Sequence, residues 1–487
     1  MCSVIHWQID AESLWAHQGP IKAKGEESPI SGLRWRCGLP TECRLMTRSP
    51  SPWVPDNSRR AFLRTSALLT GGGLLGRLPL DRGVHAAADT RLRIGLIGCG
   101  GRGTEAALNA LNAGPDIHLV ALADIFQERL DHCLKSLRAS KPGQVTVAPD
   151  HCFVGFDAYQ SLISSGVDVV LITPASHFIP QMFKAAVDAG KHVFCEKPHG
   201  IDMPGLHTVR AACEIARQKG LSIVSGLCWR YAPGLRETMK RVHDGAIGEI
   251  VAIQENYVGA PYIVRARRPG QTELEYQMWN WYHFNWLSGD QTAQQLIHSL
   301  DKASWALRDK PPLKAWGLGG RQTCVDPSFG DQFDHQAVVF EYAHGARVFG
   351  FTRDQTECFN NTSDLILGTK GRCSVIDCRI EGENPWHYEG PRPNMYEVEH
   401  QELFDSIRAG RPIDNSDYMV LSSALAIVAQ MACYSGEMIA WDEALKSQRS
   451  FSLPRYAWDV EPPVKPGPDG RYPAALQGKT EFERWRM

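Results

Sequence analysis

The sequence lacks several features that would narrow its class at once. No uninterrupted apolar run reaches the roughly 18 residues that a membrane-spanning helix needs. The formal net charge is only -2, which gives no indication of a nucleic acid partner. There is no Cys-x-x-Cys pair, and Cys373 and Cys378 are too isolated to indicate a zinc site. We therefore expect no metal site, no nucleic acid partner and no membrane span in the mature protein.

Cysteine itself is not scarce, because the chain has 14 of them. Three fall within the first 45 residues, whereas Cys99, Cys195 and Cys213 lie in or beside predicted strands and helices. Cysteine at such positions behaves as a small apolar side chain. We expect mostly free, buried thiols, which is compatible with folding in a reducing compartment.

The N-terminal region contains the parts of an export signal. Residues 58–64 read SRRAFLR, which resembles the twin-arginine signal of bacteria. An apolar region, Thr65–Leu80, and a small-residue cleavage site, Ala86–Ala88, follow in the order that a signal peptide requires. We expect a twin-arginine signal over residues 46–88, a doubtful extension over 1–45 and a periplasmic protein. The alternative for this segment is a short amphipathic helix.

The most informative stretch begins at residue 91. The apolar run Leu92–Ile97 predicts a buried strand, and it enters the glycine turn GCGGRG at residues 98–103. A helical pattern and a second apolar run, Leu119–Ala123, follow, and that run ends on Asp124. This is the strand–GxGxxG–helix–strand–acid context that a dinucleotide-binding fingerprint requires.

Each part of the fingerprint has a physical task. Gly98 permits the tight turn, Gly100 lets the backbone approach a pyrophosphate, and Gly103 lets the helix pack on the strand. The helix N-terminus offers free N–H donors to that anion. Asp124 can bond the ribose hydroxyls and would repel a 2′-phosphate, which favours NAD over NADP. The predicted cofactor contacts here are Gly98, Gly100, Gly101, Arg102, Gly103 and Asp124.

Apolar runs alternate with helical patterns through the next hundred residues. The run Val167–Ile172 ends in TPASH at residues 173–177. A later strand ends in Glu196–Pro198, and a helix is predicted over Met203–Lys219. This alternation predicts an α/β fold with a doubly wound Rossmann domain over residues 89–226. Ligands of such sheets bind at the carboxyl ends of the strands.

The pattern changes from about Ile247. The sequence predicts an α+β domain with a largely antiparallel open sheet over residues 227–445, followed by a tail over 446–487 that wraps the surface. The expected strands are Ile250–Tyr257, Gln336–Tyr342 and Ala346–Thr352, and the expected helices are Thr292–Leu307 and Tyr418–Ser435. We expect the late helix to pack back on the core.

Four of these motifs together carry a family resemblance. The glycine fingerprint, TPASH, the strand-ending Glu196–Pro198 and the helical His298 resemble the Gfo/Idh/MocA oxidoreductases over residues 91–445. The tail PRYAWDVEPP resembles that of secreted, twin-arginine members of the family. The resemblance implies that Lys197 hydrogen-bonds the reacting oxygen and that His298 is the general base. It also implies that the following residues contact the cofactor: Thr173, Pro174, His177, Glu196 and Lys197.

One position departs from the family pattern. Family dehydrogenases often have an aspartate four residues before the histidine, and here that residue is Gln294. Glutamine carries no charge, so it would not raise the basicity of His298.

Substrate residues are expected at two places. The aromatic segment around Trp281, Tyr282 and His283 can stack on sugar rings, or it can be a hydrophobic plug under the sheet. Arg230 and Tyr231 match a family position near substrate, with the same uncertainty between a substrate role and a structural one.

Together these observations predict a periplasmic NAD-dependent oxidoreductase that acts on a hydroxyl of a sugar, sugar acid or polyol. An exported enzyme meets no free NAD pool, so we expect a tightly held cofactor, and the open sheet is expected to form a homo-oligomer. The first alternative is an NAD-dependent glycosidase that works by transient oxidation and elimination. The second is a non-catalytic sugar-binding protein, against which Lys197 and His298 argue.

Overall fold

A computed structural model gives the structure of residues 91–479. The predicted extension, export signal and cleavage site lie outside the described residues, as do the last eight residues of the tail. All described residues belong to one compact unit.

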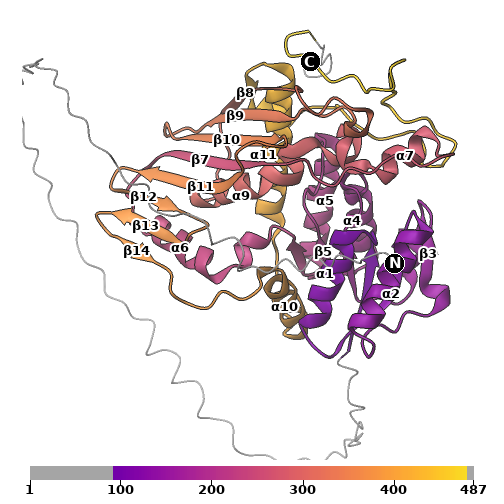
Figure 1. Ribbon diagram of the computed structural model, residues 1–487. Coiled ribbons are helices and arrows are strands. Elements are labelled where there is room, and N and C mark those ends of the chain that lie inside the picture. The colour runs from indigo at the N-terminus through magenta and orange to yellow at the C-terminus, as the bar shows by residue number, and fades with distance from the viewer. Residues whose placement is uncertain (1–90, 480–487) are drawn as a thin grey trace, which may run out of the picture. The chain divides into compact units, whose positions relative to one another are not determined.

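The first half of the unit is a six-stranded sheet in which every pairing is parallel, with strand order β3-β2-β1-β4-β5-β6 (Figure 1). Its strands are β1 (Leu92–Ile97), β2 (Ile117–Asp124), β3 (Cys152–Val154), β4 (Val169–Ile172), β5 (His192–Cys195) and β6 (Ile223–Ser225). Its helices are α1 (Gly101–Asn112), α2 (Gln127–Ser140), α3 (Ala158–Ser164), α4 (Ile179–Asp188) and α5 (Met203–Lys219). The doubly wound fold is confirmed.

Helix α5 shows why local sequence signals place some elements so well. Asp202 precedes the helix, and its side chain accepts a hydrogen bond from the backbone N–H of Gly205. Gly220 ends the helix in the left-handed conformation, with φ of 65°. An acidic N-cap and a glycine stop are strong boundary signals, and the observed bounds are those that the sequence predicts.

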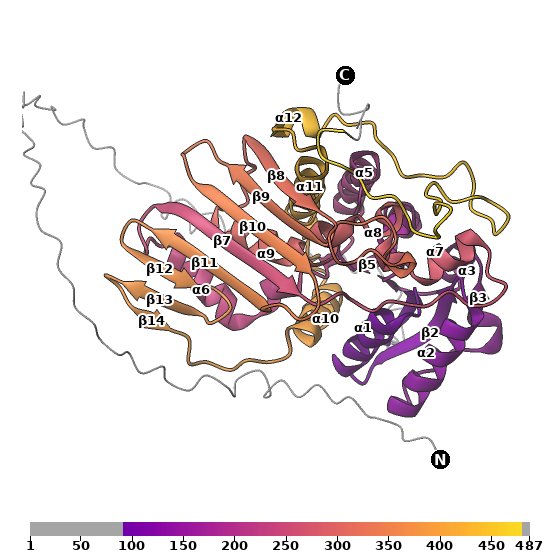
Figure 2. The same cartoon turned by 45° about the horizontal axis from the view of Figure 1, so that its top comes forward.

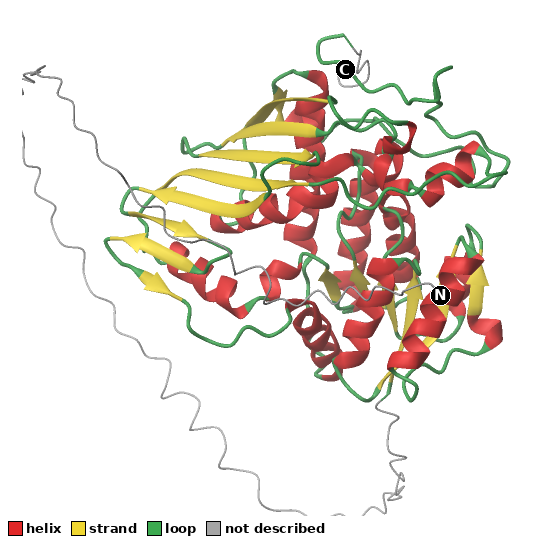
Figure 3. Ribbon diagram, in the orientation of Figure 1, coloured by secondary structure: helices red, strands yellow, loops and turns green. Residues whose placement is uncertain are grey.

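The second half contains a nine-stranded sheet with order β14-β13-β12-β11-β7-β10-β9-β8-β15 (Figure 3). Its strands are β7 (Ile250–Gly259), β8 (Lys314–Gly320), β9 (His335–Glu341), β10 (Arg347–Asp354), β11 (Asn361–Gly368), β12 (Gly371–Ser374), β13 (Arg379–Gly382), β14 (Trp386–His387) and β15 (Ile439–Ala440). The sheet is mostly antiparallel, with one correction: β7 and β10 run parallel. A long crossover separates them in the chain, and crossovers rather than hairpins join parallel strands.

The helices of this half are α6 (Pro233–His243), α7 (Glu273–Trp279), α8 (Asn285–Ser288), α9 (Ile297–Ala306), α10 (Met395–Arg408), α11 (Ser416–Ser435) and α12 (Trp441–Ala444). The predicted helix over Thr292–Leu307 is corrected at its start, because Thr292–Leu296 forms a π-turn before α9 begins. Turns of this kind occur often at functional sites.

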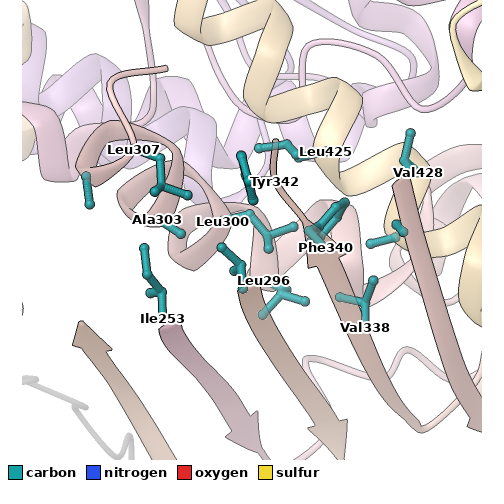
Figure 4. Packing of buried hydrophobic residues seen from close by; sticks show 14 of the residues in the cluster. Ile253, Leu296, Leu300, Ala303, Leu307, Val338, Phe340, Tyr342, Leu425 and Val428 are labelled. Carbon is teal, nitrogen blue, oxygen red and sulfur yellow. The ribbon is translucent and has the colours of Figure 1, made fainter. Parts of the chain in front are cut away.

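The core of the second half lies between the sheet and helices α9 and α11 (Figure 4). Leu296 and Leu300 come from the helical side and Val338 and Phe340 from the strands, all of them almost fully buried. In Figure 2 the helices gather on one face of the sheet. On the opposite face, Trp316, Leu318 and Phe351 are exposed.

Helix α11 packs on the core, as expected. Among the described residues it is the one helix long and apolar enough to cross a membrane by length and composition, yet 83% of its apolar window is buried inside the protein. Beyond α12 the tail has no regular secondary structure and runs over the Rossmann domain, where the rings of Trp458 and Phe156 lie 4.7 Å apart. The cysteines of residues 91–479 are free thiols and most are buried, as predicted.

Candidate functional site

An open cleft of about 1140 Å³ lies at the carboxyl ends of β1, β2 and β4. It contains the glycine turn at its floor and the end of β2 at one side. Eight of the predicted cofactor residues line it: Gly98, Gly100, Gly101, Arg102, Gly103, Asp124, Thr173 and Pro174.

The glycine turn has the shape that a pyrophosphate requires. Gly98 has φ of 91°, and a Cβ there would stand 2.6 Å from the Thr173 carbonyl. A Cβ on Gly103 would stand 1.9 Å from the Gly98 oxygen, so the helix could not pack this closely with any other residue. A Cβ on Gly100 would meet nothing within 4 Å, and no side chain caps α1. The helix N-terminus is therefore open to an anion, and these residues fit NAD.

Asp124 ends β2 and is almost fully buried, at 9% exposure. Its carboxylate accepts hydrogen bonds from the backbone N–H groups of Cys99 at 2.7 Å and Phe126 at 2.8 Å. Burial raises the pKa of this carboxyl group despite those bonds. Each carboxylate oxygen can accept more than one hydrogen bond, so Asp124 can still bond a ribose hydroxyl.

Arg129 is a cleft residue that the sequence analysis missed. Its guanidinium lies 4.8 Å from the ring of Phe126 and 4.6 Å from that of Trp279, and it donates to the Trp279 carbonyl at 2.8 Å. Arg129 lies five residues after Asp124 in the sequence, and both residues line the cleft. The sequence signal that could have identified this residue is an arginine shortly after the acidic residue that ends the strand.

A segment that we call the roof, residues 260–283, also lines the cleft. It contributes Tyr262, Trp279, Trp281 and Tyr282, and the rings of Tyr262 and Tyr282 stack at 4.4 Å. The predicted aromatic segment is thus divided. Trp281 and Tyr282 face the cleft, whereas His283 is 3% exposed and its ring nitrogen meets the Ile263 carbonyl at 3.3 Å.

Lys197 follows β5 and is partly buried. Its ammonium donates to the backbone carbonyl of Gln294, in the π-turn, at 2.6 Å. Burial lowers its pKa, and the carboxylate of Glu196 acts in the opposite direction. The Rossmann half and the second half of the unit thus meet at this lysine.

His298 lies in the first turn of α9, directly after the π-turn. Its Nδ1 is buried and has no hydrogen-bond partner among residues 91–479. Burial lowers its pKa well below the usual histidine range, and the positive charges of Lys197, Lys302 and Arg102 lower it further. His298 is therefore neutral near pH 7 and able to accept a proton.

Gln294 does not partner His298. Its side-chain amide donates to the Ser176 hydroxyl at 2.8 Å and to the Ser288 carbonyl, and its own carbonyl holds Lys197. Through these hydrogen bonds, Gln294 connects the π-turn to the Rossmann half. Neither Lys197 nor His298 lines the cleft itself, but Tyr282, which does, hydrogen-bonds Gln295 beside them.

A group of buried polar atoms lies on the inward side of β7, β9 and β10 and on the π-turn and α9, beside the apolar core. We call it the polar layer. Within the described residues the following atoms have no hydrogen-bond partner: both carboxylate oxygens of Glu255, Oδ1 of Asp354, Oε1 of Gln291 and Gln336, and the hydroxyls of Thr292, Ser299 and Thr352. Buried polar atoms normally have hydrogen-bond partners. A group of buried polar atoms without partners therefore indicates a hydrated or ligand-binding region. The sequence signal for the polar layer is the presence of polar residues at the alternate positions of β7 and β10 that point inward.

Four predicted site residues lie elsewhere. The substrate role expected for Arg230 and Tyr231 is not supported, because the Arg230 guanidinium pairs with Asp301 at 2.9 Å and the Tyr231 hydroxyl donates to Asn415 at 2.7 Å, both in the interior. His177 bonds the Tyr456 hydroxyl at 2.7 Å and lines a different groove.

Glu196 is the fourth. It pairs with Arg102 at 2.6 Å rather than lining the cleft. Apolar runs predict where strands end, but the direction of a side chain at a strand end depends on partners far away in the sequence.

Across residues 91–479 no cluster of three or more His, Cys, Asp or Glu side chains is arranged to hold a metal ion.

A parallel Rossmann sheet with an open glycine cleft at the carboxyl ends of its strands has the architecture of a dinucleotide-binding domain. Residues 92–226 match the sequence family GFO_IDH_MocA, described as an oxidoreductase family with an NAD-binding Rossmann fold. This part of the chain is therefore similar to the Gfo/Idh/MocA oxidoreductases.

Known proteins resemble the chain at low identity. Myo-inositol dehydrogenase Hyg17 of Streptomyces leeuwenhoekii is 26% identical over 42% of this chain and 58% of its own length, so the match spans little more than half of that relative. Inositol 2-dehydrogenase of Rhizobium meliloti is 23% identical over 59% of this chain and 76% of its own.

A glycosyl hydrolase family 109 protein of Stenotrophomonas maltophilia is 28% identical over 41% of this chain and 42% of its own. Among solved structures, aldose-aldose oxidoreductase of Caulobacter crescentus superposes with a TM-score of 0.57 and 20% identity. That match covers 72% of this chain and 99% of the other, and at this identity it shows a shared fold.

Proposed function

We propose that the protein oxidises a hydroxyl group of a sugar, sugar acid or polyol to a carbonyl, with NAD as the hydride acceptor. The observation that carries this proposal is the polar layer beside His298. A polyhydroxy substrate can exchange hydrogen bonds with the buried side chains of Glu255, Asp354 and Thr352. The inositol dehydrogenases among the relatives support the same substrate class.

The residues near the substrate divide the proton chemistry between them. Neutral His298 accepts the proton of the reacting hydroxyl, and the Lys197 ammonium donates a hydrogen bond to the oxygen as negative charge develops there. When bound, NAD supplies the site to which the hydride moves. The ring faces of Trp281 and Tyr282 can stack on the substrate or the nicotinamide.

Purified protein with added NAD and a panel of inositols, aldoses and sugar acids tests this directly. We expect absorbance at the NADH wavelength to rise with at least one member of the panel and to stay flat for the His298→Ala variant. No reduction with any polyol, while NAD remains bound, would contradict the proposal.

NAD is proposed over NADP because Asp124 lines the cleft at the end of β2, and a carboxylate there would repel a 2′-phosphate. Mass analysis of the supernatant from denatured protein, purified without added nucleotide, identifies the cofactor that copurifies. Recovery of NADP would refute the preference.

A second candidate function is glycoside cleavage by transient oxidation and elimination. The relative named as a glycosyl hydrolase favours it, although that match covers less than half of either chain. Elimination requires removal of a proton beside the oxidised carbon, so product formed in deuterated water would carry deuterium. Sustained aglycone release with deuterium in the sugar and no net NADH would replace the first function by this one.

We also propose export through the twin-arginine pathway, supported by the SRRAFLR motif alone. Replacing Arg59 and Arg60 with lysine should retain folded protein in the cytoplasm. Unchanged periplasmic accumulation would refute the assignment.

A further inference from the structure

A charged pair connects the glycine turn to the residue that precedes Lys197. Arg102 lines the cleft with 28% of its side chain exposed, and its Nε donates to Glu196 at 2.6 Å. Glu196 is 5% exposed, and its other oxygen accepts the backbone N–H of Lys197 at 3.2 Å. A Cβ on Gly226 would stand 2.9 Å from that carboxylate, so the glycine leaves the space that the buried Glu196 side chain occupies.

Neighbouring side chains contact the guanidinium of Arg102. The Tyr396 ring of α10 lies 4.6 Å from it, and Glu399 of the same helix approaches to 3.8 Å. Helices α1 and α10 pack side by side, as Figures 1 and 2 show. Glu105 pairs with Arg102 at 3.2 Å from the solvent side and is 58% exposed.

We propose that Arg102 and Glu196 couple occupancy of the pyrophosphate site to the charge on Lys197. The proposal rests on the proposed function only in taking the glycine turn as the pyrophosphate site and Lys197 as the substrate-facing lysine. Without cofactor, Arg102 neutralises Glu196 and itself repels the ammonium. A pyrophosphate at the N-terminus of α1 attracts the guanidinium, which leaves the fixed Glu196 carboxylate to stabilise the Lys197 ammonium. Arg102 is a positioning residue in this scheme.

Burial favours the neutral forms of the other titratable groups near these residues. Burial lowers the pKa of His199 to about 3 and raises that of the Cys228 thiol, while His298 is neutral for the reasons given above. Burial also raises the pKa of Glu399 well above its usual value.

The remaining neighbours of Glu399 behave in the same way. Burial lowers the pKa of His400 to about 3, and burial together with the nearby acids raises that of the Tyr231 hydroxyl. The Tyr396 hydroxyl also has a raised pKa, with the Cys228 thiol as the largest cause. The charges that remain beside Lys197 are those of Arg102 and Glu196.

The charge on Lys197 can be measured without any substrate. Competitive acetylation with acetic anhydride across pH, read by mass spectrometry of the Lys197 peptide, reports the deprotonated fraction of that lysine. ADP-ribose is the probe, because it carries the pyrophosphate without the positive nicotinamide. We expect ADP-ribose to move the Lys197 acetylation profile of the wild-type protein to higher pH.

Variants of Arg102 distinguish the proposed coupling from a general loss of structure. Arg102→Met should move the profile to higher pH without ligand, and ADP-ribose at concentrations shown by calorimetry to saturate the site should move it no further. Arg102→Lys should restore part of the response, and the control Glu105→Gln should behave as wild type because its carboxylate is exposed and screened. Circular dichroism checks the fold of each variant.

Two results would overturn the coupling: a wild-type profile unmoved by bound ADP-ribose, or an Arg102→Met profile that still moves with it. Neither outcome depends on whether a sugar is oxidised, so failure of the coupling and failure of the proposed function are distinguishable.

Discussion

At the residue scale, the proposed oxidation depends on the protonation states of Lys197 and His298. Burial and the positive charges of Lys197, Lys302 and Arg102 lower the pKa of His298, so its imidazole is neutral near pH 7. Gln294, the departure from the family pattern, is consistent with this arrangement because an aspartate there would favour the charged imidazole.

Removal of the His298 side chain should lower turnover strongly. We expect His298→Ala to reduce kcat by about 10²–10⁴-fold, the usual contribution of a general base, with bound NAD retained. His387→Ala, at an exposed histidine of β14, is the matched control and should leave kcat unchanged. Steady-state rates with the best polyol check this, and a near wild-type rate for His298→Ala would assign the base elsewhere.

Changes at Asp124 should act on cofactor choice. Asp124→Ala removes the ribose acceptor and should weaken NAD binding by about 1–3 kcal/mol, the range for a lost charge-assisted hydrogen bond. It should also reduce discrimination against NADP. Because the carboxylate also accepts the N–H groups of Cys99 and Phe126, Asp124→Asn is the control that keeps a local acceptor. Titration calorimetry with both nucleotides measures the effect; equal NAD affinity in wild type and Asp124→Ala would contradict it.

At the element scale, the sequence predicted what local chemistry controls. The glycine turn and the capped helix α5 were found because their signals lie within a few residues of one another. The π-turn was missed because its apolar spacing resembles that of an α-helix, and the β7–β10 pairing was missed because strands a hundred residues apart choose partners through the whole sheet. The polar layer and Arg129 depend on side-chain directions that only the assembled fold supplies.

The roof is the element that should control cofactor release. Trp279 is the centre of its contacts, with the guanidinium of Arg129 at 4.6 Å and that of Arg268 at 3.7 Å from its ring. Such contacts contribute about 0.5–2 kcal/mol each. We expect Trp279→Ala to speed NADH release about tenfold in stopped-flow fluorescence. Trp386→Ala, on β14, removes a similar contact with Arg241 of α6 and should leave release unchanged. Equal release rates for the two variants would exclude a clamping role for the roof.

At the scale of the whole molecule, the site is assembled from both halves of the unit, and the nine-stranded sheet leaves one face uncovered. Trp316, Leu318, Phe351 and Leu367 stand on that face with 37–54% exposure. Apolar side chains gathered in this way mark interaction surfaces. We propose, as the sequence analysis expected, that the face joins copies of this chain.

Charge placed on the open face should separate the copies. Leu318→Glu should lower the mass measured by analytical ultracentrifugation toward that of one chain. Phe359→Glu, at a loop residue 77% exposed, is the control and should leave the mass unchanged. A wild-type protein that sediments as one chain at all concentrations would refute the oligomer.

Buried acids of the polar layer should give the whole molecule a characteristic pH dependence. Burial and neighbouring acids raise the pKa of Asp354 to about 8, and burial raises that of Asp290 to about 7. Because the folded state holds these protons longer than the unfolded chain does, their stabilisation is complete below about pH 4 and is lost as pH rises through 7 and 8.

Buried histidines such as His177 and His283, with pKa values lowered to about 4, act in the opposite direction, but only below about pH 6.5. Between pH 6.5 and 8 the acids therefore dominate. Each contributes up to about 1.4 kcal/mol per pH unit, and the melting temperature should fall across this window. Asp354→Asn, which keeps the shape and the neutral charge, should flatten that fall, whereas the exposed Asp459→Asn should not. Melting curves from pH 6 to 8.5 measure it, and an identical slope in wild type and Asp354→Asn would show that Asp354 is already ionised in the folded protein at pH 6.5.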